Sequence, residues 1–374
     1  MLYITKKHLK PGMILAKDIF LYNLSNFNTL LLAKGQVLNN IYINRINYHN
    51  IEGAYIESEA FSDIVVEPYI DDNLKTESLN GIRDTYYEFQ ISSGKINAPM
   101  IKQMSSIVNN IVKELLYKDT LTYNLMDFKN YDSYTFQHCL NVAVLSISTG
   151  ISMELNERKL NDIGLAGMLH DIGKMLIPIE ILNKPGELTR EEYEIIKTHP
   201  VNATKLLRNM VPYEVLRAIE DHHEKLDGTG YPNGKKAGNI SFYSKILSVC
   251  DVYDALTSDR PYRKSVFPNE VVEYLMGCAD KQLDYKILKH FIKVIVAYPV
   301  GTFVKLSNGK LAVVIKNHSE NILRPVVRII NSDGTIIGED IDLLSNEDYM
   351  NITIVDMGYD YENLGLTSIL KSVL

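Results

Sequence analysis

The chain has 374 residues, of which 46% are hydrophobic and 23% charged, and its formal net charge is −7. This length predicts two to three domains, and the composition excludes a fibrous protein or a long disordered chain. The negative charge argues against a nucleic acid polymer or an anionic membrane as a partner. Because residues 1–8 lead into no signal-peptide core and no apolar run is long enough to span a bilayer, we expect a cytoplasmic protein without a membrane anchor.

The first part of the chain predicts a small folded module and a linker. Residues 1–68 mix short β-rich runs with turn signals, which is typical of an α+β module. Residues 69–80 include the polar stretch from Asp71 to Ser78, which lacks periodicity and predicts a linker.

The pattern then becomes helical over residues 81–298, where apolar residues recur every three or four positions. Thr189 and Glu192 form a capping-box pattern that marks one helix start. From residue 299 the period changes to two, and Asn308-Gly309 predicts a hairpin with a type I′ turn. A second hairpin is expected at Asp333-Gly334. Residues 299–374 are therefore expected to form a C-terminal, mostly β domain without a catalytic cluster.

Histidines concentrate in the helical region. Five of the nine lie within the 86 residues from 138 to 223, where an even distribution would place about two: His138, His170, His199, His222 and His223. Imidazole is the commonest protein ligand for transition metals near neutral pH, and carboxylates often complete such sites. A metal centre explains this concentration better than five unrelated core histidines. The remaining four, His8, His49, His290 and His318, are expected to be ordinary structural residues.

The neighbours of these histidines support a shared site. His170-Asp171 and His222-His223 each follow an apolar run and are expected at a helix end, with Gly173 as a C-terminal cap after the first pair. Asp251 and Asp254 share one helix face, and an aspartate among apolar residues is costly unless it is paired or ligated. Cys139 and Cys250 show no metal-binding spacing and are expected to be small core residues.

Five segments together resemble the HD-GYP family, the bacterial cyclic di-GMP phosphodiesterases of the HD superfamily. They cover about residues 125–290 and comprise Tyr134 to Ala143, His170 to Lys174, His199-Pro200, His222 to Pro232, and Asp251 to Arg263. The resemblance implies a multidomain protein in which a central all-α HD-type bundle is flanked by the α+β module and the β-rich domain.

The resemblance also implies a ligand set for two divalent transition metals, with iron or manganese favoured. His138, His170, Asp171 and Asp251 are similar to the ligands of the first metal. His199, His222 and His223 are similar to those of the second, with Asp171 bridging. Tyr134 stands where some members have a glutamate for a third metal, so we expect two.

Further residues are expected to contact the substrate or the ligands. Lys174 follows Asp171 by three residues and is placed to neutralise charge on a phosphoryl group, and Arg260 and Arg263 are candidates to hold a second phosphate or a guanine edge. Tyr231, in the Gly-Tyr-Pro loop, is a candidate substrate contact, with a buried turn tyrosine as the alternative. Asp254 is expected to orient a metal ligand or a cation.

The leading hypothesis is hydrolysis of cyclic di-GMP to linear pGpG, with GMP as a further product, through a hydroxide held between two metals. Alternatives are hydrolysis of a related cyclic dinucleotide such as cyclic GMP-AMP, a catalytically weak nucleotide-binding adaptor, and a nucleotide triphosphohydrolase of the wider HD superfamily. A homodimer is one assembly that the sequence allows.

Overall fold

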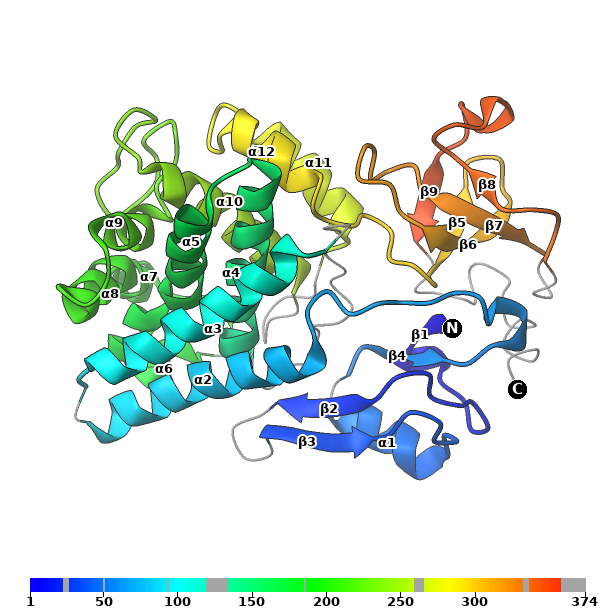
Figure 1. Cartoon of the computed structure of the whole chain (residues 1–374), viewed down its shortest axis with the longest axis horizontal. Coiled ribbons are helices and arrows are strands. Elements are labelled where there is room, and N and C mark those ends of the chain that lie inside the picture. The colour runs from blue at the N-terminus through cyan, green and yellow to red at the C-terminus, as the bar shows by residue number, and fades with distance from the viewer. Residues whose placement is uncertain are drawn as a thin grey trace. The chain divides into compact units, whose positions relative to one another are not determined.

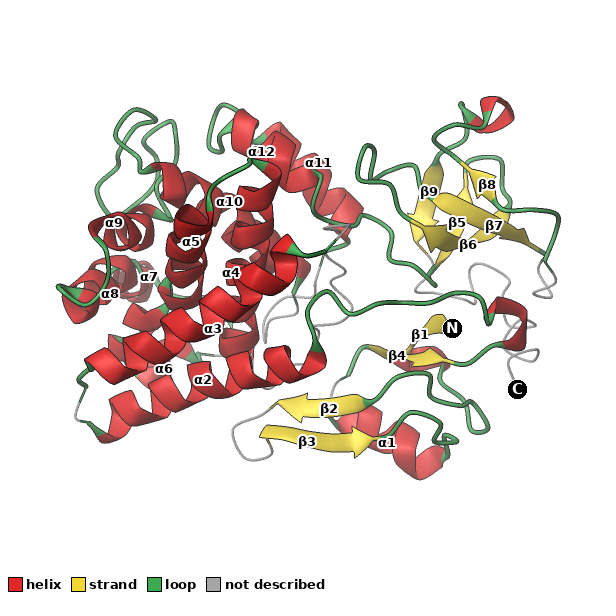
Figure 2. Ribbon diagram, in the orientation of Figure 1, coloured by secondary structure: helices red, strands yellow, loops and turns green. Residues whose placement is uncertain are grey.

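The computed structural model describes residues 1–22, 27–49, 51–92, 94–118, 134–184, 186–258, 266–331 and 336–357. Within these ranges the chain divides into two compact units, each described here by itself. The helical unit holds the described residues of 70–118 and 134–294, and the terminal unit holds those of 1–69 and 295–357. Figure 1 labels their elements, and Figure 2 separates helices from strands.

All regular secondary structure described in the helical unit consists of helices. Along the chain these are α2 (Asp72–Ile91), α3 (Ala98–Leu116), α4 (Tyr134–Ser152), α5 (Glu157–Leu169), the 3-10 helix η4 (Ile172–Leu176), α6 (Ile179–Leu182), α7 (Arg190–Ile196), α8 (His199–Leu207), α9 (Tyr213–Asp221), α10 (Phe242–Thr257), α11 (Pro268–Gly277) and α12 (Tyr285–Ile292).

Helices α4, α5 and α10 form the centre of this unit. Helix α5 packs against α3, α4 and α9, while α10 packs against α4, α9, α11 and α12. The apolar stripe of α3 is buried, as its spacing predicts, and Thr189 and Glu192 form the expected capping box at the start of α7. The structure confirms the predicted helical bundle.

The expected linker is wrong in its local structure, because helix α2 begins at Asp72. The Asp71 carboxylate caps this helix by accepting hydrogen bonds from the amides of Asn73 (2.9 Å) and Leu74 (3.3 Å). Leu79 and Ile82 are fully buried, and α2 packs against α3 and α4. Capping and tertiary packing thus make this segment helical, although its apolar periodicity is weak.

The terminal unit combines two small antiparallel ribbons with a five-stranded antiparallel sheet. The ribbons pair β1 (Leu2–Thr5) with β4 (Gly53–Ile56) and β2 (Ile19–Tyr22) with β3 (Phe27–Leu32), and α1 (Asn40–Tyr48) lies between β3 and β4 in sequence. The sheet has the order β8-β7-β6-β5-β9. Its strands are β5 (Phe303–Leu306), β6 (Leu311–Lys316), β7 (Val326–Ile330), β8 (Ile341–Asp342) and β9 (Ile354–Met357). Both flanking predictions, an α+β part and a β-rich part, are confirmed.

The hairpin at Asn308-Gly309 is confirmed, but its predicted turn type is wrong. Strands β5 and β6 pair with Lys305 opposite Leu311. Gly309 has φ +83°, whereas Asn308 has no positive φ, as a type I′ turn would require. The Leu306 amide donates to the Lys310 carbonyl, so the loop has three residues and ends on a left-handed glycine. The second predicted hairpin, at Asp333-Gly334, lies outside the described residues.

Residues from both ends of the chain share one hydrophobic core. Phe303, Val313 and Ile330 of the sheet pack with residues of the N-terminal segment, including Leu2 and Ile56. The Tyr3 amide donates to the Gly301 carbonyl at 3.1 Å. The Arg328 guanidinium also donates to both carboxylate oxygens of Asp63, at 3.0 and 2.7 Å. The two terminal segments, which the sequence suggested as separate modules, form one body in the structure.

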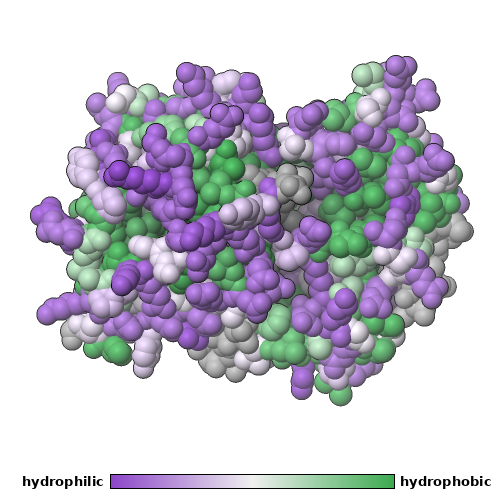
Figure 3. Space-filling view, viewed as in Figure 1, coloured by the Kyte–Doolittle hydropathy of each residue, from purple (hydrophilic) through white to green (hydrophobic). Residues whose placement is uncertain are grey.

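Apolar side chains on the face drawn in Figure 3 are interspersed with polar ones. Among the described residues, no helix is both long and apolar enough to cross a membrane.

Because the core is shared, a substitution in the C-terminal sheet that removes a core side chain is expected to destabilise the ribbon of β1 and β4. Phe303, 2% exposed, contributes to this core, so Phe303→Ala is expected to lower the free energy of unfolding of the terminal unit by about 3–5 kcal/mol. Urea unfolding followed by hydrogen exchange at the β1 and β4 amides measures the effect. Val355→Ala, at a side chain 59% exposed, is the control. Unchanged exchange in β1 and β4 would contradict a common core.

Candidate metal centre

Seven histidine and aspartate side chains meet inside the helical unit, most of them at helix ends. His138 lies on α4 and Asp251 on α10, while His199 is the first residue of α8; His170-Asp171 and His222-His223 directly follow α5 and α9. Six of the seven are buried, and the His223 side chain is 24% exposed. The predicted helix-end positions of the two pairs are confirmed.

Two glycines allow the backbone to bring these residues together. A Cβ atom at Gly167 on α5 would lie 2.6 Å from the Ala143 Cα on α4, so only glycine permits this helix contact. A Cβ at Gly173 would collide with the carbonyl oxygen of His199 and lie 2.6 Å from the Ala203 amide nitrogen. The predicted C-terminal cap at Gly173 is wrong, because His170 is the C-cap of α5 and Gly173 lies inside η4. Its role is close packing, which places Asp171 beside His199.

The first cluster contains His138, His170 and Asp171, with Asp251 beside it. The Nε2 atoms of His138 and His170 are 3.2 Å apart. Asp171 Oδ2 lies 3.7 Å from His138 Nε2 and 3.6 Å from His170 Nε2. Asp251 Oδ1 lies 3.1 Å from His138 Nε2. Nitrogen and carboxylate atoms therefore converge on one small volume.

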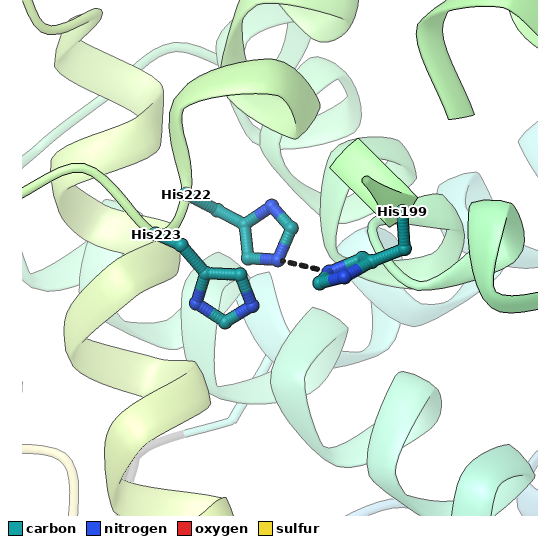
Figure 4. Close-up of side chains that lie close together, drawn as sticks. All are labelled: His199, His222 and His223. Carbon is teal, nitrogen blue, oxygen red and sulfur yellow. Dashed lines mark hydrogen bonds between the residues drawn. The ribbon is translucent and has the colours of Figure 1, made fainter. Parts of the chain in front are cut away.

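The second cluster contains His199, His222 and His223. In Figure 4, His222 and His223 face His199, and the Nε2 atoms of His199 and His222 are 3.3 Å apart. Asp171 Oδ1 lies 3.4 Å from His199 Nε2, and Asp251 Oδ2 lies 3.6 Å from His223 Nδ1. Asp171 and Asp251 each direct one oxygen to each cluster.

Backbone carbonyl groups fix the tautomers of three of these rings. The Nδ1 atoms of His170, His199 and His222 lie 2.8, 2.8 and 2.6 Å from the carbonyl oxygens of Gly167, Ile196 and Ile219. A carbonyl can only accept, so each Nδ1 carries the proton and each neutral ring has a lone pair on Nε2. These lone pairs point into the clusters.

Burial and charge divide the titrating groups. Burial lowers the pKa of His199 to about 3 and that of His222 to about 4, so both rings are neutral at pH 7. Burial alone would also lower the pKa of His138, but hydrogen bonds to Asp251 and Asp254 outweigh it and raise this pKa to about 9. Against the effect of burial, Lys174 and the imidazoles hold the pKa of Asp171 well below its ordinary value.

This arrangement fits divalent transition metals. Two Nε2 lone pairs facing each other across 3.3 Å, as in His199 and His222, repel unless a proton or cation lies between them. Asp171 Oδ1 is buried and has no hydrogen-bond partner among the described residues. Imidazole nitrogens with ionised carboxylates are the donors that borderline metals prefer, so the residues present fit a two-metal group.

Comparison with known proteins agrees with this geometry. A family model described as HD domain matches residues 110–287, and one described as KOW domain associated with HD domain matches residues 303–361. A cyclic di-GMP phosphodiesterase of Pseudomonas aeruginosa is 38% identical over 230 residues, which are 61% of this chain and 55% of that protein. A 3′3′-cGAMP-specific phosphodiesterase of Vibrio cholerae is 38% identical over 165 residues, 44% of this chain and 38% of that protein. The chain thus spans about half or less of these relatives.

A solved structure supports the same fold. It is of a protein from Bdellovibrio bacteriovorus described as an HDG"Y"P protein, with TM-score 0.51 and 16% identity over 78% of this chain and 97% of that one. The matched HD region contains both clusters together with Gly230-Tyr231-Pro232. Residues 110–287 thus match the HD domain, and the clusters with the Gly-Tyr-Pro segment make this region similar to HD-GYP proteins.

Asp254 supports the first cluster from the side of His138 that faces away from the other ligands. Its Oδ2 accepts from His138 Nδ1 at 2.7 Å, and its Oδ1 accepts from Asn141 Nδ2 at 2.8 Å. The carboxylate therefore fixes the His138 ring with Nε2 facing the cluster, a common arrangement around metal-binding histidines. Sequence reasoning missed Asn141, although it lies three residues after His138 and so shares its helix face.

Of the residues predicted to contact the substrate, the structure describes Lys174 and Tyr231. The Lys174 ammonium donates to Asp171 Oδ2 and its side chain is 26% exposed, so the cation sits at the edge of the centre. The Tyr231 ring lies against His223, with centroids 4.6 Å apart and planes at 33°. Lys197 Nζ, which sequence reasoning missed, lies 5.9 Å from the Tyr231 ring centroid. Arg260 and Arg263 lie outside the described residues.

A buried carboxylate that sequence reasoning also missed organises the Gly-Tyr-Pro loop. Glu224, 2% exposed, accepts from the amides of Asn233 (2.7 Å) and Lys235 (2.9 Å). A Cβ at Gly230 would lie 2.5 Å from the Glu224 Cα, so the loop folds tightly around this residue. Its position directly after His222-His223 was the available signal.

The pKa values predict acid sensitivity of the metal-free protein. His199 and His222 have pKa values of about 3 and 4 when folded, against about 6.5 when unfolded, so the unfolded chain binds more protons between pH 6.5 and 4. The contribution of these rings to the free energy of unfolding is thus fully present above pH 6.5. It is lost as the pH drops to 4, by roughly 3 kcal/mol per ring. Urea unfolding of chelator-treated protein from pH 7 to 4 checks this.

His222→Asn serves as the control, because it removes one titrating ring and should flatten the slope. His138 acts in the opposite range: its pKa of about 9 means that the stability it contributes is lost as the pH rises from 6.5 through 9. A free energy of unfolding that stays constant between pH 6.5 and 4 would contradict neutral, buried His199 and His222.

Loss of the Glu224 carboxylate should loosen the loop and leave the metal ligands in place. Glu224→Ala leaves two backbone amides without acceptors and is expected to lower the free energy of unfolding by about 1–3 kcal/mol. Hydrogen exchange of the Asn233 and Lys235 amides should accelerate, with metal content unchanged. Glu220→Ala, which removes a more exposed acceptor for the Asn233 side chain, should leave these amides protected. If the Asn233 and Lys235 amides of the Glu224→Ala variant exchange as slowly as those of the wild type, Glu224 does not organise the loop.

Proposed function

We propose that this chain hydrolyses cyclic di-GMP to linear pGpG, with GMP as a further product, and that two divalent transition metals, iron or manganese, occupy the two clusters. The observation that carries the proposal is Asp171, which directs Oδ2 to His138 and His170 and Oδ1 to His199. A single carboxylate between two imidazole clusters suits two metals that share a ligand.

The proposed ligands follow from the clusters. His138, His170, Asp171 and Asp251 would hold the first ion, and Asp171, His199, His222 and His223 the second. When bound, such a pair supplies Lewis acidity and an activated water for in-line attack on phosphorus, with the 3′ oxygen as leaving group.

Other residues would position the substrate and stabilise charge. Lys174, half-buried at the edge of the centre, would neutralise charge that develops on the phosphoryl oxygens. The Tyr231 ring lies against His223, and its aromatic surface suits a guanine base. Asp254 would hold His138 in its ligating orientation. Arg260 and Arg263 stay predicted contacts for the second phosphate or a guanine edge.

A second candidate substrate is 3′3′-cyclic GMP-AMP, because the Vibrio cholerae relative is named for it. We favour cyclic di-GMP because the Pseudomonas relative matches over 230 residues rather than 165. The seven clustered residues disfavour a catalytically weak adaptor. Cytoplasmic location and a homodimer stay predictions from the sequence.

The central test is substitution of the shared carboxylate. Asp171→Ala is expected to reduce hydrolysis by more than the roughly 10- to 100-fold typical of losing a supporting residue, because it removes a ligand from both ions. Protein loaded with Mn(II) or Fe(II) is assayed with cyclic di-GMP and 3′3′-cyclic GMP-AMP, and products and bound metal are quantified.

Glu157→Ala, which removes an exposed carboxylate at the other end of α5, is the matched control and should retain full activity. Wild-type protein that retains no transition metal, or an Asp171→Ala variant that retains turnover, would refute the mechanism. Faster turnover of 3′3′-cyclic GMP-AMP than of cyclic di-GMP would replace the favoured substrate.

A further inference from the structure

Asn141 is connected to the first cluster through the carboxylate of Asp254. Helices α4 and α10 pack against each other (Figure 1). From α10, Asp254 accepts from His138 Nδ1 at 2.7 Å through Oδ2 and from Asn141 Nδ2 at 2.8 Å through Oδ1. Asn141 lies three residues after His138 and so shares its face of α4. One carboxylate therefore bridges two side chains that are neighbours on a single helix.

Water is excluded from this connection. Asp254 is fully buried, and His138 and Asn141 are each 2% exposed. A carboxylate oxygen can only accept, so the Asn141 amide group must face Asp254 with its nitrogen, and its own oxygen points elsewhere. The orientation of the Asp254 carboxylate thus depends on two protein donors, of which His138 is one and Asn141 the other.

The second atom of the Asn141 amide argues against a role in packing alone. Asn141 Oδ1 is buried and has no hydrogen-bond partner among the described residues. An unmet buried acceptor costs free energy of the same order as one buried hydrogen bond contributes, so the two effects of this amide largely offset each other. An apolar side chain would fill the same space without that cost. It would not supply a donor to Asp254.

The orientation of Asp254 matters because α10 contacts both ring nitrogens of His138. Asp251, three residues before Asp254, places Oδ1 3.1 Å from His138 Nε2, whereas Asp254 is the partner of Nδ1. If the Asp254 carboxylate rotated about its Cβ–Cγ bond, Oδ2 would leave Nδ1 and the imidazole could turn. The Nε2 lone pair would then no longer face the first cluster.

We propose that Asn141 is a positioning residue for the first metal: its amide fixes the Asp254 carboxylate, which in turn fixes the His138 ring. The inference rests on the proposed function, in which His138 is a ligand of that ion. The support of the ligand then extends across two hydrogen bonds to α10 and back to the helix that carries His138.

Asn141→Leu and Asn141→Ala test this, because both remove the donor, and alanine cannot clash with its neighbours. Thr149→Val is the matched control, since it also removes a buried polar group from α4, where the hydroxyl donates to the Leu145 carbonyl at 2.8 Å. The readouts are the affinity for Mn(II), the visible absorption of the Co(II)-loaded protein, and kcat and KM for cyclic di-GMP at saturating Mn(II).

Both Asn141 variants should bind Mn(II) about 10-fold more weakly, change the Co(II) spectrum and lower kcat, with KM unchanged. Thr149→Val should match the wild type in every readout. If the Asn141→Ala variant keeps the wild-type metal affinity and Co(II) spectrum, or if Thr149→Val changes them as much, the proposal is wrong.

A double-mutant cycle separates action through Asp254 from any independent effect. Asp254→Ala alone should weaken Mn(II) binding, and adding Asn141→Ala to it should weaken binding no further. Losses of affinity that multiply in the double variant would overturn the proposal. Failure of the proposed function is distinguishable: a wild-type protein that binds metal and cleaves no cyclic dinucleotide refutes the activity, while the metal affinities and the Co(II) spectrum still decide the role of Asn141.

Discussion

The buried carboxylate of Asp171 is the constraint around which the helical unit is organised. An ionised carboxylate in an apolar interior is expensive unless cations or donors surround it. Here Lys174 donates to one oxygen, while the other faces His199 without a hydrogen bond. The chain tolerates this because Gly173 lets the turn after α5 approach α8, and Gly167 lets α5 approach α4. The two glycines therefore determine where the Asp171 carboxylate can lie.

The same site separates neutral from charged imidazoles by their partners. Carbonyl acceptors at Gly167, Ile196 and Ile219 hold three rings with Nδ1 protonated. Carboxylates on both sides of His138 favour its protonated form. His138 would therefore have to lose a proton at neutral pH before it could hold a metal, whereas His199 and His222 would offer neutral nitrogens directly. The two halves of the centre differ in what metal binding requires, although both are rich in histidine.

Sequence reasoning found the cluster residues because clustering, spacing and chemistry coincide there. His170-Asp171 and His222-His223 follow amphipathic runs, so their helix-end positions could be predicted. The helix over Asp72–Ile91 could not, because its stability depends on capping by Asp71 and on contact with α3 and α4. Glu224 and Asn141 were missed for a related reason: each acts through contacts with residues that the local pattern does not identify. The turn at Asn308-Gly309 shows a limit of another kind, since one dipeptide suits two loop lengths.

The common core of the two chain ends means that the helical unit interrupts the terminal unit in sequence. Phe303, Val313 and Ile330 are synthesised more than 230 residues after Leu2 and Ile56, with which they form that core. The core of the N-terminal segment consequently stays incomplete during synthesis until β5, β6 and β7 have been made, and the intervening helices form a long loop that folding must close. Prior folding of the helical unit shortens that loop, because it replaces a flexible segment with a compact body. A protein truncated before residue 295 would keep both histidine and aspartate clusters. Its N-terminal segment would lose the apolar residues of the C-terminal sheet against which it packs.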